Sequence, residues 1–377
     1  MIALGFFDTL PLTHKHIKSA AEAKLGKTYV FMHLNQKLIN LWHLVGNTPM
    51  LEIYYIYQGK PGKLYVKCEH YNLTGSVKDR MALYILSKAY QQGMIRSGNT
   101  IIEVTSGNTG IAFAALGKSL GHPVKIIMPN WLSEERRDII RSMGAEIIML
   151  NQNEGGFLGS IELSEYLEQQ SNNIFLPRQF KNIYNAEAHE MTTGPEIWLQ
   201  LQSVGLVPDA FVAGVGTGGT VMGTGKFLRS KNPDMRIHPL EPAESPTLTT
   251  GYKTGSHRIQ GISDDFIPDV LKLAELDEVV QANDGDAIIM AQKLAKQLGL
   301  AVGISSGANI IGAIKLAQML GRDAIIVTLL CDSNKKYLST DLIKTEPEKL
   351  AYLSTHVNFT DYRPICRLPA PLIDRSI

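Results

Sequence analysis

The chain has 377 residues, of which 44% are apolar and 19% charged, and its formal net charge is +1. This composition is typical of a soluble enzyme with a large core, and the length exceeds what one hydrophobic core usually supports, so we expect two lobes. The near-neutral charge, with no basic stripe, gives no electrostatic footprint for a nucleic-acid partner.

The cysteine content and the hydropathy indicate in which cellular compartment the protein is expected. Three cysteines (Cys68, Cys331 and Cys366) do not make a disulfide framework in so long a chain, and none of them has zinc-site spacing. We therefore expect a reducing, cytoplasmic location and no metal site. No stretch approaches the roughly 20 apolar residues of a membrane span, so no membrane partner is expected.

The first part of the chain predicts an extension and one α/β lobe. Residues 1–36 have no convincing periodicity and are interpreted as an N-terminal extension. Residues 37–180 form the predicted N-terminal lobe, whose first strands are candidates to cross to the other lobe. Its expected strands cover 51–57, 63–69, 100–104, 124–129 and 145–150, with helices over about 77–92, up to 119 and over 133–144. This alternation predicts a parallel sheet with helices on both faces.

Residues 181–345 predict a second α/β lobe. A long helix is expected around 185–202, followed by strands over 209–216, 236–242, 278–282, 301–305 and 323–332, and by helices up to 230, over 285–299 and over 306–320. Ligands bind at the carboxyl ends of parallel strands, so the cleft between the lobes is the expected place for a site. Residues 346–377 are interpreted as a C-terminal tail.

The stretch GSVKDR (75–80) places Lys78 in the first turn of a predicted helix. A cation is disfavoured at this positive end, so the amine is expected to titrate low, and a Gly-Ser turn would expose it at the sheet edge. A neutral amine there is a nucleophile suited to Schiff-base chemistry. An ordinary solvated lysine is the simpler alternative. Asp79 and Arg80 are expected to form structural ion pairs or caps.

The stretch TSGNTG (105–110) follows a strand and opens the next helix. Ser106, Asn108 and Thr109 could hold a carboxylate together with the loop amides, and Asn108 could donate to a phenolate-type oxygen. A turn with capping hydroxyls is the alternative. Further along, Gln179 is a candidate substrate contact, and Ser305 is either an N-cap or a ligand to a heteroaromatic nitrogen. His189 is not predicted to be a base.

The stretch VAGVGTGGTVMGTG (212–225) runs from a strand through a glycine-rich loop into a helix. Glycines let backbone N–H groups approach an anion, and the helix dipole favours it, so a phosphorylated ligand is predicted. Gly214, Gly216 and Gly219 also fit the dinucleotide fingerprint, which leaves a dinucleotide-dependent oxidoreductase open. The dense GTGGT cluster, with hydroxyls from Thr217 and Thr220, favours a single phosphate monoester.

Taken together, these motifs resemble the cysteine synthase family over about residues 38–345. The resemblance rests on GNTP (46–49), GSVKDR, TSGNTG, TTGPEIW (192–198), GVGTGGT, EPAESP (241–246), IQGI (259–262) and ISSGA. It implies a fold type II pyridoxal-phosphate enzyme of the tryptophan-synthase-β type. Such an enzyme has two three-layer α/β lobes with mostly parallel sheets, and the cofactor lies in the cleft between them. A homodimer and serine acetyltransferase as a partner are implied as well.

The resemblance also implies a role for each candidate residue. Lys78 would form the Schiff base with pyridoxal 5′-phosphate and later move the α-proton. The substrate carboxylate would be held by Thr105, Ser106, Asn108, Thr109 and Gln179, and Asn108 would also lie near the 3′ oxygen. The phosphate would be bound by Gly216, Thr217, Gly218, Gly219 and Thr220, and the pyridine nitrogen would meet Ser305.

The implied activity is that of a transferase, O-acetylserine sulfhydrylase. O-acetylserine would lose acetate to give an aminoacrylate on the cofactor, and sulfide would then add to give cysteine. A cystathionine β-synthase-type reaction with homocysteine stays open, because GSVKDR occurs in that branch too. The chain departs from the family pattern at Cys331, where proline is more usual, and at Asn185-Ala186. A non-catalytic relative is disfavoured by the intact Lys78, TSGNTG and GTGGT.

Overall fold

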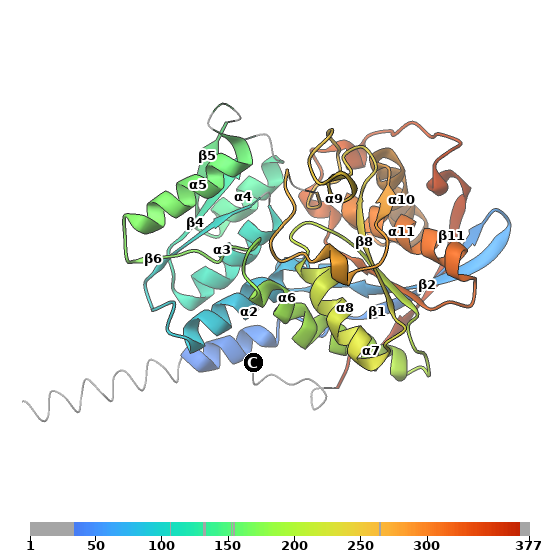
Figure 1. The fold of residues 1–377 in the computed structure, drawn as a ribbon, viewed down its shortest axis with the longest axis horizontal. Coiled ribbons are helices and arrows are strands. Elements are labelled where there is room, and N and C mark those ends of the chain that lie inside the picture. The colour runs from blue at the N-terminus through green and yellow to red at the C-terminus, as the bar shows by residue number, and fades with distance from the viewer. Residues whose placement is uncertain are drawn as a thin grey trace, which may run out of the picture.

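Two β-sheets of unequal size organise the molecule (Figure 1). The computed structural model describes residues 34–105, 107–130, 133–151, 153, 155–263 and 265–369. Within these residues the larger sheet has the strand order β11-β1-β2-β10-β7-β8-β9 and the smaller β5-β4-β3-β6. Pairings are parallel except for those of β1 with β2 and with β11. This mostly parallel, two-sheet α/β architecture confirms the predicted fold class.

The smaller sheet is covered by helices on both faces. Neighbouring residues of a strand point to opposite faces, so Ile101 packs into the cluster under α2 and α3, whereas Ile102 packs with Phe157 of α5. Its strands are β3 (Thr100–Val104), β4 (Val124–Pro129), β5 (Glu146–Leu150) and β6 (Ile174–Phe175). Its helices are α2 (Lys78–Gln91), α3 (Asn108–Leu120), α4 (Glu134–Ser142) and α5 (Gly156–Gln169).

The larger sheet has the same three-layer build. Val212 packs into the cluster shared with α10 and α11, and its neighbour Phe211 packs into the cluster shared with α7 and α8. The strands are β1 (Met50–Tyr57), β2 (Lys60–Cys68), β7 (Ala210–Gly214), β8 (Arg236–Pro242), β9 (Val280–Ala282), β10 (Ile326–Leu330) and β11 (Val357–Ile365). The helices are α6 (Tyr184–Ala188), α7 (Gly194–Gln202), α8 (Gly219–Lys231), α9 (Thr247–Thr250), α10 (Asp284–Leu298) and α11 (Ile304–Leu320).

Both ends of the described chain contribute strands to the larger sheet. The hairpin β1–β2 belongs to it because β2 pairs with β10, as in the register of Tyr65 with Val327. The prediction of a tail for 346–377 is wrong for the segment 357–365, which forms β11 on β1. Val357, Phe359 and Ile365 bury apolar side chains there, and Pro364 is tolerated because β11 is an edge strand. Residues 370–377 and most of the predicted extension lie outside the described residues.

The helix predicted around 185–202 is interrupted. A π-helical turn, His189–Thr193, separates α6 from α7. Pro195 follows at the start of α7 and cannot donate a backbone hydrogen bond, which favours a break before it. Inside the turn, the His189 Nδ1 lies 2.8 Å from the Thr193 hydroxyl.

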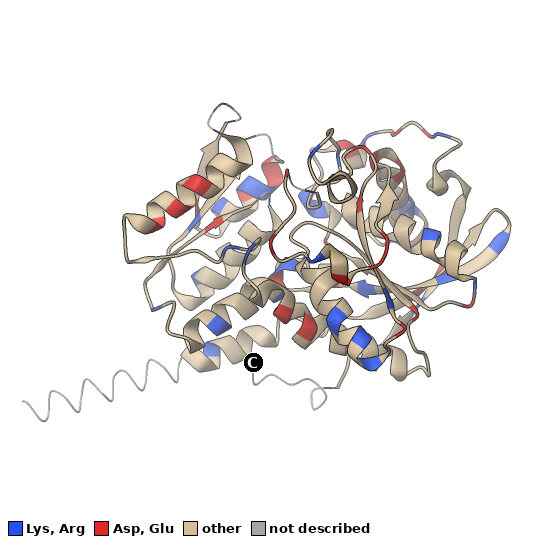
Figure 2. Ribbon diagram, viewed as in Figure 1, with Lys and Arg blue, Asp and Glu red and all other residues tan. Residues whose placement is uncertain are grey.

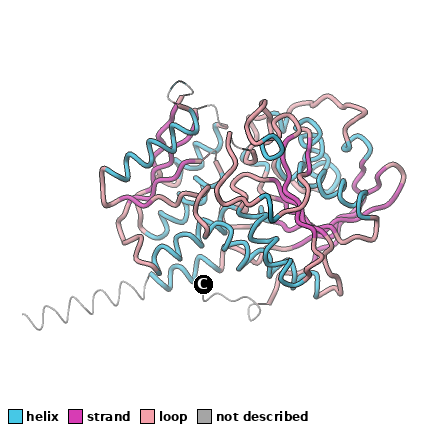
Figure 3. The backbone as a smooth tube through the Cα atoms, viewed as in Figure 1, coloured by secondary structure: helices cyan, strands magenta, loops and turns pink. Residues whose placement is uncertain are grey.

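The two lobes meet at a region of loops, and charged residues are found on both lobes. Figure 2 shows basic and acidic residues distributed over both lobes. None of the described helices is both long and apolar enough to cross a membrane. Figure 3 shows loops gathered between the two sets of strands. Among them are the segments that follow β3, β7 and β10 at their carboxyl ends, and these carry residues of one cavity.

Candidate active site

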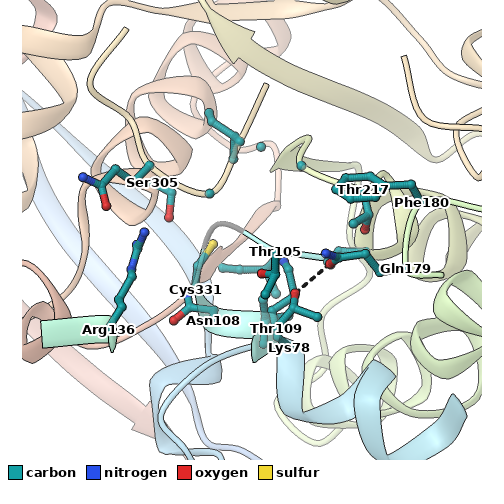
Figure 4. Close-up of a pocket in the computed structure, with 18 residues that line it drawn as sticks. Lys78, Thr105, Asn108, Thr109, Arg136, Gln179, Phe180, Thr217, Ser305 and Cys331 are labelled. Carbon is teal, nitrogen blue, oxygen red and sulfur yellow. Dashed lines mark hydrogen bonds between the residues drawn. The ribbon is translucent and has the colours of Figure 1, made fainter. Parts of the chain in front are cut away.

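A cavity between the lobes brings together side chains that are far apart in the sequence (Figure 4). Most of the predicted site residues line it: Lys78, Thr105, Asn108, Thr109, Gln179, Gly216, Thr217, Thr220 and Ser305. Gly218 and Gly219 lie in the same loop but do not line the cavity. Ser106 lies outside the described residues. The two predicted anion cradles and the predicted nucleophile therefore belong to a single site.

Lys78 is the first residue of α2, so its position depends on the segment just before that helix. This segment is tied to the chain that follows β10. The Val77 N–H donates to the Cys331 carbonyl over 2.9 Å, and Ser76 forms a β-bridge with Asp332. The lysine is thus held at the junction of the two lobes, as its side chain reaches the cavity (Figure 4).

The glycine-rich loop between β7 and α8 is shaped so that only glycine fits. A Cβ atom at Gly216 would lie 2.5 Å from the Gly261 carbonyl oxygen, and one at Gly219 would lie 2.0 Å from the Asn185 Oδ1. Gly218 has φ of 84°, which favours glycine. In the described part of the chain, the amides of Gly216, Thr217 and Gly218 donate to no protein acceptor. Such a loop fits a phosphate monoester.

Two hydroxyls of this loop are oriented by neighbouring side chains. The Asn185 Nδ2 donates to the Thr217 Oγ1 over 2.8 Å, which leaves the Thr217 hydrogen for a ligand. The His189 Nε2 lies 3.2 Å from the Thr220 Oγ1. Burial, together with the charge of Arg80, lowers the pKa of His189 to about 3, so the ring is neutral. His189 therefore orients a hydroxyl, and its place next to the loop was not predicted from the sequence.

The loop after β3 is braced against Gln179. The Thr109 hydroxyl donates to the Gln179 Oε1 over 2.7 Å (Figure 4). The Gln179 Nε2 donates to the Val104 carbonyl over 2.7 Å. Gln179 is only 2% exposed. The Thr105 Oγ1 accepts from the Gly107 N–H over 3.0 Å. The loop is thus a polar concave surface that can hold a carboxylate.

Asn108 has two charged hydrogen-bond partners, and Ser305 lies at the start of a helix. The Asn108 amide donates to the Asp332 carboxylate over 2.7 Å and accepts from the Lys336 ammonium over 2.9 Å. Ser305 is the second residue of α11, whose N-cap is Gly303, so the N-cap alternative for Ser305 is wrong. Its hydroxyl lies at the start of a helix and at the cavity wall, where it can meet a ring nitrogen.

Several cavity residues were not predicted from the sequence. Among them are Arg136, Phe180, Gln260 and Cys331. Arg136 belongs to the charged run EERR, a pattern typical of a solvent-exposed helix face. It is nevertheless only 1% exposed, and its guanidinium carbon lies 4.7 Å from the centroid of the Tyr337 ring. Burial raises the pKa of the Cys331 thiol to about 12, so it is a neutral group and not a nucleophile.

Glu103, which is buried behind this site, is expected to make the stability of the fold depend on pH. It is 4% exposed, and burial raises its pKa to about 8, although it accepts from the N–H groups of Val104 and Gln179. A glutamate in an unfolded chain titrates near about 4.3. Between these values the folded chain binds the extra proton, so its free energy of unfolding should fall as pH rises. The expected slope is at most about 1.4 kcal/mol per pH unit.

The variant Glu103→Gln should remove this part of the slope. Urea unfolding of the wild type and the variant at a series of pH values measures the difference. Glu146→Gln is a matched control, because Glu146 is exposed on β5 of the same sheet. Parallel pH profiles for the wild type and Glu103→Gln would contradict the assignment.

Comparison with known proteins agrees with this geometry. Residues 41–332 match the family model described as pyridoxal-phosphate-dependent enzyme. The chain is 39% identical to a probable cysteine synthase of Bacillus subtilis over 303 residues, which is 80% of this chain and 97% of the relative.

Solved structures are similar as well. A hydrogen sulfide-producing enzyme of Fusobacterium nucleatum is 55% identical, with a TM-score of 0.86, covering 89% of this chain and 100% of that one. A cysteine synthase of Entamoeba histolytica is 35% identical, with a TM-score of 0.76, covering 84% and 94%.

Proposed function

The chain belongs to the family of pyridoxal-phosphate-dependent enzymes, and we propose that it is a cysteine synthase. It would convert O-acetylserine and sulfide into cysteine and acetate. One observation carries the proposal: Lys78 reaches a cavity from the start of α2, and the glycine-rich loop after β7 lines the same cavity from the other lobe. A lysine and one glycine-rich anion loop in the same cavity suit a cofactor with one ring carbonyl and one phosphate.

The residues present fit the cofactor. Lys78 would hold it covalently, and the phosphate would lie on Gly216, Thr217, Gly218, Gly219 and Thr220. Ser305 would meet the pyridine nitrogen, and Asn108 the ring oxygen. When bound, the cofactor supplies an electron sink that weakens bonds at the substrate's α-carbon. A neutral hydroxyl partner at the ring nitrogen would make the cofactor a weaker electron sink. A weaker sink favours loss of a β-substituent over a long-lived carbanion.

The chain's own residues would bind the substrate and move its proton. Thr105, Ser106, Asn108, Thr109 and Gln179 would hold the carboxylate and so direct the α-hydrogen toward the Lys78 amine. Lys78 would take this proton as a general base, since it lies in the same cavity as the carboxylate site. The bracing of Gln179 by Val104 and Thr109 supports a fixed substrate orientation, which contributes to the rate by proximity.

A second candidate is the release of sulfide from cysteine. It is favoured by the 55% identity to a structure described as a hydrogen sulfide-producing enzyme. The same proton removal from cysteine would expel sulfide, and another nucleophile would add at the β-carbon. Homocysteine as that nucleophile would give cystathionine. The same cavity residues would serve all of these reactions. The reactions differ in the group that leaves the β-carbon and in the nucleophile that adds to it.

One set of assays distinguishes these activities. The purified enzyme is given O-acetylserine, serine or cysteine as donor, each with sulfide, homocysteine or thiosulfate as acceptor, and cysteine, cystathionine and sulfide are measured. Cysteine formation from O-acetylserine and sulfide as the fastest reaction would support the proposal. Faster sulfide release from cysteine would favour the second candidate. No turnover with any pair, in protein that contains the cofactor, would contradict both.

We also propose a cytoplasmic homodimer. Exposed apolar side chains on neighbouring segments support a covered surface, with Ile183 69% and Met191 48% exposed. Light scattering of the purified protein would report its mass, and a monomer would contradict the dimer. Serine acetyltransferase is a candidate partner; a peptide with a C-terminal isoleucine should then compete with O-acetylserine.

A further inference from the structure

The Asn108 side chain is held between two groups of opposite charge. Its Nδ2 donates to the Asp332 Oδ2 over 2.7 Å, and its Oδ1 accepts from the Lys336 Nζ over 2.9 Å. Asn108 begins α3 of the smaller lobe, whereas Asp332 and Lys336 follow β10 of the larger sheet. The contact therefore joins the two lobes at the cavity wall.

Both charged groups are buried and held in place. Asp332 is fully buried and Lys336 is 3% exposed. The Tyr337 hydroxyl donates to the Asp332 Oδ2 over 2.5 Å, and the Lys336 Nζ also donates to the Gly75 carbonyl over 3.2 Å. The Ser133 hydroxyl donates to the Lys336 carbonyl over 3.2 Å. These contacts from several segments fix where the charges lie relative to Asn108.

This arrangement selects one orientation of the amide. A flip would place the Asn108 NH₂ group against an ammonium and its carbonyl against a carboxylate, and both contacts would be repulsive. In the observed orientation Asp332 takes one Nδ2 hydrogen, and the second is left for an acceptor in the cavity that Asn108 lines.

We propose that Asp332 and Lys336 are positioning residues that hold the Asn108 amide with an N–H directed at the cofactor's ring oxygen. This rests on the proposed function, in which Asn108 contacts that oxygen. An oxygen of phenolate type is an acceptor, so it needs the donor side of the amide. Neither Asp332 nor Lys336 lines the cavity, and the Asn108 amide is the cavity-lining side chain that both of them contact.

A double-mutant cycle tests this coupling. Asn108→Ala, Lys336→Met and the double variant are compared as cofactor-loaded enzymes, by the absorption maximum of the bound cofactor, its pH titration and kcat/KM. Lys336→Met is expected to shift the absorption in the same direction as Asn108→Ala and to lower kcat/KM about tenfold, the size of one lost hydrogen bond to a charged group. In the Asn108→Ala background the Lys336→Met change should have little further effect.

Controls separate positioning from a general structural role. Lys336→Arg keeps the charge and should restore most of the spectrum and activity. Lys335→Met removes an exposed lysine from the same turn and should change neither. If Lys336→Met does not fold, Asp332→Asn takes its place in the double-mutant cycle with Asn108→Ala. Additive effects in the double variant would overturn the inference. If Asn108→Ala itself left the absorption unchanged, the proposed contact of Asn108 would fail, and the inference with it.

Discussion

Replacement of Lys78 with alanine is expected to abolish turnover, lowering kcat/KM by at least about a thousandfold, as is usual for loss of a catalytic nucleophile. Lys78 is proposed both to hold the cofactor covalently and to move the substrate's proton, and alanine can do neither. The cradle at Gly216 to Thr220 is untouched by the change. The variant should therefore still bind the cofactor, but without a covalent bond and without the visible absorption band of the wild type.

The measurement combines steady-state rates, visible absorption and thermal unfolding. Lys88→Ala is a matched control, because Lys88 lies in the last turn of the same helix and pairs with Glu187 near the surface. It should keep full activity and the wild-type spectrum. Substantial activity in the folded Lys78→Ala variant would refute the assigned role of Lys78.

The variant Glu196→Gln is expected to lower the free energy of unfolding by about 3–5 kcal/mol, the usual cost of breaking a buried ion pair. Glu196 lies 2.7 Å from the Arg80 Nη2 and 2.8 Å from the Lys67 Nζ, and Arg80 also pairs with Glu69 over 2.6 Å. Burial alone would raise the pKa of Glu196, but Arg80 and Lys67 outweigh it and hold the pKa well below its usual range. The glutamine leaves two buried cations with a single carboxylate.

Denaturant unfolding of the wild type and the variant at neutral pH gives the difference. Lys226→Met serves as the control, because it breaks an ion pair of comparable length with Glu190 whose lysine is 70% exposed. That change should cost less than about 1 kcal/mol. Similar losses for the two variants would mean that burial does not set the strength of this network. Because Arg80 lies two residues after Lys78, Glu196→Gln should also disturb the start of α2.

The sequence alone was sufficient for what is local. A strand followed by a glycine-rich turn and a helix predicts where an anion is bound, and GTGGT and TSGNTG occupy the ends of β7 and β3 as expected. The position of Lys78 at the start of a helix was predicted for the same reason. The family resemblance predicted that these stretches share one cavity, and the cavity contains residues of all three.

What the sequence did not predict depends on contacts between distant segments. The strand β11 was not predicted, whereas β1 and β2 were candidates to cross to the other lobe. Their place in the larger sheet follows from pairing with β10 and β1, which strand periodicity does not encode. Arg136 reads as a solvated charge because the partner that buries it, Tyr337, is about 200 residues away. Asp332 and Lys336 were not predicted as positioning residues, because that role depends on their contacts with Asn108 in the other lobe.

Chemical trapping at Lys78 tests the central claim most directly. The purified enzyme is reduced with borohydride, digested and analysed by mass spectrometry. The peptide that contains Lys78 should carry the mass of one reduced pyridoxyl phosphate, and prior addition of O-acetylserine should reduce that labelling. Label on another lysine, or none on protein that has the cofactor's visible absorption, would contradict the account.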